Sequence, residues 1–300
     1  MQKVLIIVGP TASGKSALGV ELARRFNGEI ISADSRQVYK GLDIGTGKIT
    51  KREMQGVRHY LLDMTSAKKR FTADQFVKAA QRAAVEIIKR KKLPIVIGGT
   101  GFYIDALLGR VSLADVAPNM TLRKNLAAKS PEQLYSLLRS RDPKRAKSMN
   151  TPSERNNKVR LIRALEVAAS SKGEPRPGKV EPCYDTLWMG INLPFKLLET
   201  KILKRLKSRM KLGMVAEARR LHKGGLSYKR MQELGLEYRS LARLLRNEIT
   251  RQEFEAELFR DIRRYAKKQI GYWKRNGDIT WVSASTDPRL KEKISAWLQT

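Results

Sequence analysis

The sequence predicts an α/β protein whose core is a parallel β-sheet covered by helices on both faces. Segments 4–8 and 93–97 are fully apolar, and segment 72–91 between them carries apolar residues at helical spacing. Apolar strands that alternate with helices are typical of such sheets, whose ligands collect beyond the carboxyl ends of the strands. We therefore expect three loops to share one edge of the sheet, at residues 9–16, 33–37 and 98–101.

The first of these loops has the P-loop pattern. It lies between the apolar segment 4–8 and a helix-like segment 16–25, and it reads Gly9-Pro10-Thr11-Ala12-Ser13-Gly14-Lys15-Ser16. The outer glycines let successive backbone N–H groups face a phosphate, and the following helix adds the positive end of its dipole. Lys15 is expected to reach terminal phosphate oxygens, and the Ser16 hydroxyl to ligate Mg²⁺. The pattern predicts a P-loop NTPase-like core that binds a polyphosphate or pyrophosphate.

The chain divides into a core and an insertion. Further strands of the core are expected at 29–32, 186–192 and 279–282. Between residues 112 and 182 helical patterns dominate (122–129, 131–139 and 157–170), followed by a segment rich in proline, glycine and charge at 172–179. We interpret residues 1–111 and 183–300 as the catalytic core with a helical C-terminal part. Residues 112–182 form the helical insertion domain.

The charge of the chain is far from balanced. It carries 61 Lys and Arg against 29 Asp and Glu, a formal net charge of +32. Such an excess repels itself in the compact state unless a polyanion offsets it, and nucleic acid is the natural partner. An anionic membrane is the rival, but no apolar stretch approaches the ~20 residues that span a bilayer. We therefore expect an RNA or DNA partner and no membrane.

Cysteine and histidine usage restricts the compartment and the metals. Cys183 is the one cysteine, so an internal disulfide framework is excluded and a reducing cytoplasm is expected. With only His59 and His222 beside it, no zinc-ligand cluster is expected. The chain enters a strand at once, so no signal peptide is expected either.

A carboxylate follows the second strand. Asp34, in Ser32-Ala33-Asp34-Ser35-Arg36-Gln37, would face a phosphate bound at the P-loop, where it could hold Mg²⁺ or act as a base. The alternative is a helix N-cap, since Asp and Ser both cap well. The next glycine-rich loop, residues 43–48, is interpreted as a turn.

The strand at 93–97 ends without an acid. A nucleotide hydrolase usually places a carboxylate there, whereas this chain continues Gly98-Gly99-Thr100-Gly101-Phe102-Tyr103. The replacement argues against NTP hydrolysis coupled to motion. It favours a close approach of the backbone to a substrate, with a hydroxyl donor beside it. The alternative is a strand-to-helix turn whose aromatic rings belong to the core, which we expect for Phe102.

Basic residues gather in three places. Arg160 and Arg163 lie one helical turn apart. Segment 201–211 carries six cations and no acid, and segment 263–275 interleaves cations with aromatic residues, as nucleic-acid contacts often do. Each run alone could be a solvated helix face, but together with the net charge they favour RNA or DNA.

These residues resemble one family along most of the chain. The motifs already quoted, with Asp43-Ile44-Gly45-Thr46, the segment 160–166 and the terminal Arg264-Tyr265-Ala266-Lys267-Lys268-Gln269, are similar to those of the bacterial tRNA dimethylallyltransferases. The resemblance implies an enzyme that transfers a dimethylallyl group from dimethylallyl pyrophosphate to N6 of adenosine 37 in tRNA. It also implies Mg²⁺ as the cofactor and a cytoplasmic location, and we expect a monomer.

The resemblance also implies roles for individual residues. Asp34, Arg205 and Thr100 would be catalytic, with Asp34 at the N6 amino group of a flipped-out adenine and Arg205 on the pyrophosphate. The pyrophosphate would lie on Gly9, Pro10, Thr11, Ala12, Ser13, Gly14, Lys15 and Ser16. The insertion would contact the anticodon stem-loop. The tRNA contacts would be Asp34, Ser35, Arg36, Gln37, Thr100, Arg123, Val159, Arg160, Leu161, Ile162 and Arg163.

Three alternatives remain at this point. An adenylate isopentenyltransferase would share the chemistry but needs neither the charge nor the insertion. A P-loop small-molecule kinase would transfer phosphate, which the Ser-Ala-Asp-Ser and Gly-Gly-Thr-Gly segments fit poorly. A non-catalytic RNA-binding protein would have no use for an intact Lys15, Ser16 and Asp34.

Overall fold

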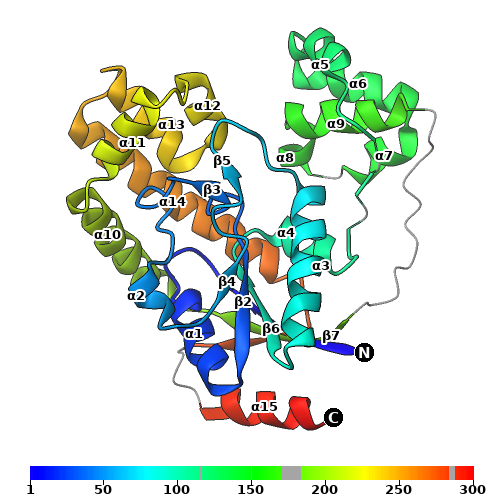
Figure 1. Cartoon of the computed structure of the whole chain (residues 1–300). Helices are drawn as coiled ribbons and strands as arrows, with labels where there is room; N and C mark the ends of the chain where they lie inside the picture. Colours follow the sequence, from blue (N-terminus) through cyan, green and yellow to red (C-terminus); the bar gives the residue numbers. More distant parts are fainter. Residues whose placement is uncertain (112, 115, 150, 171–183, 284–287) are drawn as a thin grey trace. The chain divides into compact units, whose positions relative to one another are not determined.

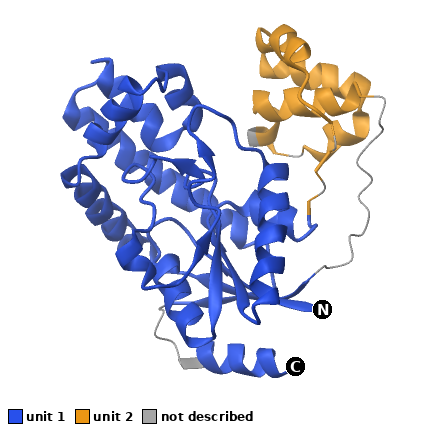
Figure 2. Cartoon of the chain, viewed as in Figure 1, with its two compact units in different colours: residues 1–110, 181–300 blue, residues 111–180 orange. Residues whose placement is uncertain are grey.

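The computed structural model describes the chain except for residues 112, 115, 150, 171–183 and 284–287, and the side chains of 153, 288 and 289. It divides into two compact units (Figure 2): residues 1–110 with 181–300, here unit 1, and residues 111–180, here unit 2. The expected boundaries at 112 and 182, segment 172–179 and Cys183 lie outside the described residues.

Unit 1 is built on a six-stranded sheet in the order β4-β2-β6-β1-β7-β8. Every neighbouring pair in it is parallel, which confirms the predicted parallel core. The strands are β1 (Gln2–Val8), β2 (Gly28–Ala33), β4 (His59–Tyr60), β6 (Leu93–Gly98), β7 (Tyr184–Ile191) and β8 (Ile279–Val282). A two-stranded sheet, β3 (Tyr39–Lys40) with β5 (Thr65–Ser66), was not predicted.

Alternate residues of the central strand enter two separate cores. Leu5 and Ile7 pack with Leu18 of α1 (Lys15–Arg25), whereas Val4, Ile6 and Val8 pack with Phe76 of α3 (Ala73–Lys89). The sheet is therefore buried on both faces, as its apolar strands require. Thr72 caps α3 with a reciprocal bond to Gln75, which starts this helix where its apolar periodicity begins.

Further helices complete unit 1, most of them from the C-terminal part of the chain (Figure 1). Two of them reach the functional loops: α10 (Phe195–Lys211) and the long α14 (Arg251–Trp273). The others are α2 (Lys51–Met54), α4 (Gly101–Leu107), α11 (Met214–Lys223), α12 (Tyr228–Leu234), α13 (Leu236–Leu245) and α15 (Pro288–Gln299). No helix in the described part of the chain is long and apolar enough to cross a membrane.

Unit 2 is a helical bundle with its own core. Its helices are α5 (Met120–Ala127), α6 (Pro131–Arg141), α7 (Pro143–Ser148), α8 (Pro152–Arg155) and α9 (Lys158–Ala168). Leu134 and Leu138 of α6 are buried against Leu161 and Leu165 of α9. Each of the five helices begins at a side chain that accepts a hydrogen bond from a backbone N–H of the first turn, which explains how short helices are defined.

Candidate active site

The P-loop leaves its amides open to a ligand. Gly14 is the N-cap of α1 in a left-handed conformation (φ 97°), and no side chain caps the helix. The first N–H groups of α1 are therefore available for an anion. Ser13 Oγ is buried and no described group bonds to it. Ala12 adopts φ 61°, a strained backbone for a residue with a side chain.

Two cations meet beside this loop. Burial, followed by the charge of Arg205, lowers the pKa of Lys15 to about 8, while the charge of Asp34 opposes the shift. Burial, followed by the charge of Arg209, also lowers the pKa of Arg205. Both charged forms are thus destabilised in the free protein, and a polyanion bound between them would relieve the repulsion. This is the electrostatic signature of an anion site.

Asp34 does not cap a helix. Residues 35–38 form turns, and one oxygen of Asp34 accepts hydrogen bonds from the backbone N–H groups of Arg36 (2.8 Å) and Gln37 (3.3 Å). The turn fixes the carboxylate, and no described group donates to its other oxygen, Oδ2. The N-cap interpretation was therefore wrong, and the alternative of an oriented carboxylate at the cleft remains.

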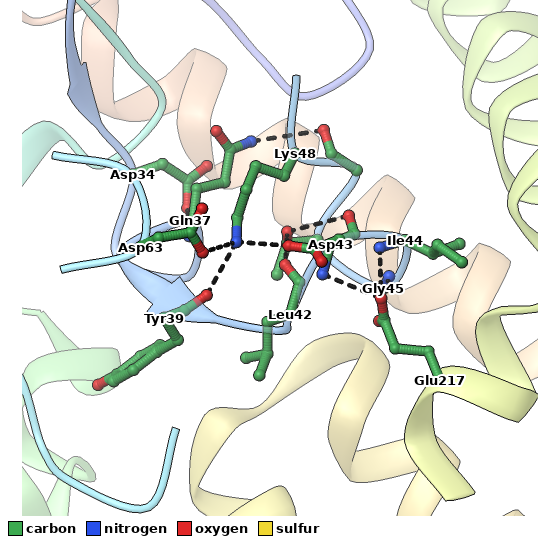
Figure 3. Close-up of polar contacts among 12 residues, drawn as sticks. Asp34, Gln37, Tyr39, Leu42, Asp43, Ile44, Gly45, Lys48, Asp63 and Glu217 are labelled. Atoms are coloured by element: carbon green, nitrogen blue, oxygen red, sulfur yellow. Dashed lines mark hydrogen bonds and ion pairs between the residues drawn. The ribbon is translucent and has the colours of Figure 1, made fainter. Parts of the chain in front are cut away.

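Loop 43–48 is more than the turn expected from its glycines (Figure 3). The Glu217 carboxylate is buried and accepts from three successive N–H groups, those of Asp43, Ile44 and Gly45, at 2.7–3.0 Å. On the other side, Lys48 Nζ contacts Asp43 Oδ1 (2.6 Å), Asp63 Oδ1 (2.5 Å) and the Tyr39 carbonyl (2.9 Å). The loop is a rigid part of the site.

This loop positions Arg205. The Gly47 carbonyl accepts from Arg205 Nη2 at 2.7 Å and from Gln37 Nε2 at 3.5 Å. Gly47 adopts φ 59°, and a Cβ there would lie 2.2 Å from the same guanidinium. Only glycine therefore permits the contact. Arg205 Nη1 also reaches Thr11 Oγ1 of the P-loop at 3.5 Å.

The glycines after β6 approach the protein's own chain. A Cβ on Gly98 would lie 2.1 Å from the Ala33 carbonyl, one on Gly99 2.1 Å from Gln269 Nε2, and one on Gly101 2.1 Å from the Tyr272 ring. The expected close approach to a substrate is thus a close approach to β2 and α14. The aromatic prediction was also wrong, because Phe102 is 45% exposed, whereas Tyr103 is buried and stacks on Phe76.

A cleft of about 640 Å³, which includes space open to solvent, joins these groups. Its polar lining includes Lys15, Ser16, Asp34, Arg205 and Gln269. Apolar side chains line it as well, namely Ile30, Ile49, Leu62 and Ile97. The cleft therefore offers both a charged end for phosphates and an apolar wall for a hydrocarbon group.

The oxygen atoms that line the cleft suit Mg²⁺ when a ligand supplies the rest of its coordination shell. Among the described residues there is no group of three or more His, Cys, Asp and Glu that could hold a metal. Mg²⁺, however, commonly takes one or two protein oxygens and completes its shell with phosphate oxygens and water. The Ser16 hydroxyl lines the cleft without a described partner, and Asp34 lines it too. These donors fit an ion that arrives with a phosphate-bearing ligand.

Comparisons with known proteins agree with this geometry. The sequence model of a family described as IPP transferase matches residues 37–276. The chain belongs to this family. It is 38% identical to tRNA dimethylallyltransferase 1 of Geotalea uraniireducens, over 96% of this chain and 95% of the relative. Tertiary structure agrees as well: a full-length tRNA isopentenylpyrophosphate transferase from Bacillus halodurans is 32% identical, with a TM-score of 0.73 over 100% of this chain and 96% of its own.

A second relative and a second structure extend the match. The tRNA dimethylallyltransferase 2 of Citrifermentans bemidjiense is 41% identical over 95% of this chain and 92% of its own. The tRNA isopentenylpyrophosphate transferase of Staphylococcus epidermidis is 32% identical, with a TM-score of 0.72 and full coverage of both chains. The family membership makes this P-loop-like protein an enzyme of the prenyltransferase class.

The predicted tRNA residues of unit 1 stay near Asp34. Thr100 Oγ1 accepts from the Ser35 N–H at 3.1 Å, so the loops after β2 and β6 are joined. The Arg36 guanidinium contacts the Ser35 carbonyl, and Gln37 lines the cleft. Thr100 does not line the cleft itself. Its observed contact is with a neighbouring loop.

The predicted tRNA residues of unit 2 differ in exposure. Val159 is 79% exposed, and Arg160 pairs with Glu154 at the surface. Leu161 is fully buried in the core of α6 and α9, so its side chain packs the unit and cannot contact RNA directly. Arg123 and Arg163 both bind the buried Glu166, and Ile162 packs at the edge of the same core.

Sequence reasoning missed two cleft residues of α14. Tyr265 and Gln269 both line the cleft, and burial with the charge of Asp34 raises the pKa of Tyr265. Both lie in the cation-rich segment that was interpreted as a nucleic-acid contact. The available signal was helical spacing, because residues 265 and 269 are four apart and share a face with buried Ile262 and Ala266.

Proposed function

We propose that this protein transfers a dimethylallyl group from dimethylallyl pyrophosphate to N6 of adenosine 37 in tRNA. The observation that carries the proposal is the cleft that Lys15 and Arg205 both line, beside a P-loop with open amides. Such a site stabilises a pyrophosphate as it leaves, which is where negative charge grows in this reaction. The names of the 35–41% identical relatives point the same way.

Each bond and proton that changes in the transfer can be assigned to a group of the substrates or of the cleft. The allylic C–O bond breaks, the new C–N bond forms at the adenine amine, and pyrophosphate leaves with the bonding electrons. The proton released from N6 passes to a base, and Asp34 Oδ2 is the oriented oxygen available for it. The adenine must leave its stack to reach Asp34, at a cost of a few kcal/mol that phosphate contacts with a basic protein offset.

Mg²⁺ would be held by Ser16 and the pyrophosphate, and would neutralise charge on the leaving group. The apolar wall of Ile30, Ile49, Leu62 and Ile97 suits the dimethylallyl group, because it excludes water from a carbon centre with cation character. These residues hold the donor, whereas the loops after β2 and β6 present the acceptor side.

A transfer assay tests the proposal. Purified protein is mixed with radiolabelled dimethylallyl pyrophosphate, Mg²⁺ and an unmodified tRNA that carries A36-A37-A38, with AMP as the parallel acceptor. We expect label on the tRNA and none on AMP. The label should vanish when adenosine 37 is replaced by guanosine. Label on AMP would instead indicate an adenylate isopentenyltransferase, and label on neither would overturn the prenyl-transfer proposal.

A further inference from the structure

Gln269 occupies a central place among the functional loops. It lies in α14, is 5% exposed, and both ends of its amide are bonded. Its Oε1 accepts from the Thr11 N–H of the P-loop at 2.8 Å, and its Nε2 donates to the Gly99 carbonyl at 3.0 Å. One side chain therefore bridges the loop after β1 and the loop after β6.

The bridge continues to Asp34. Beyond Gly99, the Thr100 N–H donates to the Ala33 carbonyl at 3.2 Å, and Thr100 Oγ1 accepts from the Ser35 N–H at 3.1 Å. Asp34 lies between Ala33 and Ser35, with its carboxylate fixed by the same turn. Hydrogen bonds, joined by short stretches of backbone at Gly99–Thr100 and Ser35–Arg36, thus connect the P-loop through Gln269 to the Asp34 carboxylate.

The fit around the amide is tight. A Cβ on Gly99 would lie 2.1 Å from Gln269 Nε2, so the backbone carries no side chain where the amide passes. Buried amides are costly to leave unpaired, and this amide uses one acceptor and one donor on two different loops. A shorter side chain from the same helix position would not reach both.

We propose that Gln269 is a positioning residue for the transfer reaction: it sets the P-loop, and with it the allylic carbon of the donor, at the correct distance from Asp34. The inference rests on the function proposed above. In-line attack needs the reacting atoms within a few tenths of an ångström of their proper places, and a shift of about 1 Å costs about 100-fold in rate. Both observed hydrogen bonds of the Gln269 amide go to loop backbone, namely the Thr11 N–H and the Gly99 carbonyl.

The test uses Gln269→Met, which keeps the length of the side chain and removes both hydrogen bonds. We expect kcat at saturating tRNA and donor to fall about 100-fold, while the affinity for inorganic pyrophosphate, measured by calorimetry, changes less than about threefold. Two controls lie in the same helix. Gln252→Met makes the same replacement at an exposed position of α14, and Ile262→Ala destabilises the core without touching either loop.

A double substitution separates positioning from folding. If Gln269 acts by placing the P-loop against Asp34, Gln269→Met should cost little, under about threefold, in a protein that already carries Asp34→Ala. If Gln269 had only a general structural role, Gln269→Met would lower kcat by the same factor in both backgrounds. The loss of kcat would then follow the loss of thermal stability, as it should in Ile262→Ala.

The outcomes are distinct from those of the function itself. A wild-type protein that does not modify tRNA overturns the proposed function, and this inference with it. A wild-type protein that modifies tRNA, with Gln269→Met equally fast or slowed equally in both backgrounds, overturns only the role of Gln269.

Discussion

Arginine and lysine have opposite surroundings in the two units. In unit 1, Lys15 and Arg205 both line the cleft with Asp34. Burial and a neighbouring arginine lower the pKa of each, the arginine being Arg205 for Lys15 and Arg209 for Arg205. In unit 2, Arg123 and Arg163 share Glu166, a carboxylate with a fully buried side chain, at 2.6–3.2 Å. An anionic ligand would give the first pair the negative charge that its surroundings lack, whereas Glu166 already gives the second pair a carboxylate partner.

The comparison shows that residue type does not define a binding site. Arg123 and Arg163 were predicted to contact tRNA, yet their observed partners are Glu166 and, for Arg163, the carbonyls of Ala114 and Val116. Arg123 holds α5 to Glu166 of α9, and Arg163 holds the chain before α5 to the same helix. Whatever they do with RNA, they do with guanidinium groups whose orientation is fixed by the fold.

The sharpest way to separate the units is to remove the carboxylate of the cleft. Asp34→Asn keeps an acceptor for the turn and removes the base, so we expect kcat to fall by about 10³-fold. Binding of tRNA, followed by filter binding or fluorescence, should change less than about threefold. A variant that retained more than a tenth of the wild-type rate would show that another group accepts the N6 proton.

The matching change in unit 2 should affect stability instead of turnover. Glu166→Gln leaves two partly buried guanidinium groups without a carboxylate, which costs about 3 kcal/mol. The surface pair Arg160–Glu154 supplies the control, because Glu154→Gln should cost under about 1 kcal/mol. Thermal and denaturant unfolding measure both, and pyrophosphate affinity should stay at the wild-type value.

The two units should also differ in how they respond to pH, through Lys15 in unit 1 and Glu166 in unit 2. Lys15 has a pKa of about 8 in the free protein, and it must be charged to bind pyrophosphate. Its protonation should therefore leave the affinity for pyrophosphate constant below pH 8. Above pH 8 the affinity should fall by up to about tenfold per pH unit. Calorimetric titrations of Lys15→Met give the background from the protons of pyrophosphate itself. A wild-type curve parallel to that of the variant would contradict the assignment.

The same variant tests the repulsion directly. Replacing Lys15 by methionine removes a desolvated charge beside Arg205, so the free protein should melt higher, by about 2–4 °C for each kcal/mol of repulsion relieved. The variant should at the same time bind pyrophosphate more weakly, but still measurably, below pH 8. The pH dependence in unit 2 has the opposite direction. Hydrogen bonds from Arg123 and Arg163 outweigh burial and lower the pKa of Glu166, so the stability that Glu166 contributes is lost as the pH falls through that pKa.

The smallest effect is expected from surface charge. Arg160→Gln should raise the KM for tRNA a few-fold and leave kcat unchanged, because a single phosphate contact is worth about 1 kcal/mol or less at an exposed position. The slope of log K against log salt should become shallower by about one unit. An unchanged slope would remove Arg160 from the phosphate contacts.

The sequence predicted five of the six strands of the main sheet, because each of them contains a run of apolar residues. It missed β4 (His59–Tyr60), which has only two residues and no such run. It also predicted the P-loop and Asp34, since both are short motifs in a local context. Loop 43–48 was underestimated because Glu217 lies more than 170 residues away. Gln269 was missed for the same reason, as its partners Thr11 and Gly99 are distant in sequence.

The aromatic residues illustrate a different limit. Phe102 and Tyr103 follow the same glycine loop, and hydrophobicity alone favours burial of the phenylalanine. In α4 the buried face is set by the contact with α3, where Tyr103 stacks on Phe76 at 4.3 Å between ring centroids. A helix of seven residues is too short to reveal that face from periodicity.

The order of the strands has a consequence for synthesis. β1 lies between β6 and β7, yet β7 pairs with it through residues Tyr184–Gly190, which leave the ribosome long after β1 does. One edge of the central strand is therefore open until the whole of residues 111–180 has been made, and an open apolar edge invites pairing with other chains. A bundle with its own core can fold first, as domains generally do during translation. During synthesis, unit 2 can therefore be folded at a stage when β1 is still unpaired on the side that β7 later occupies.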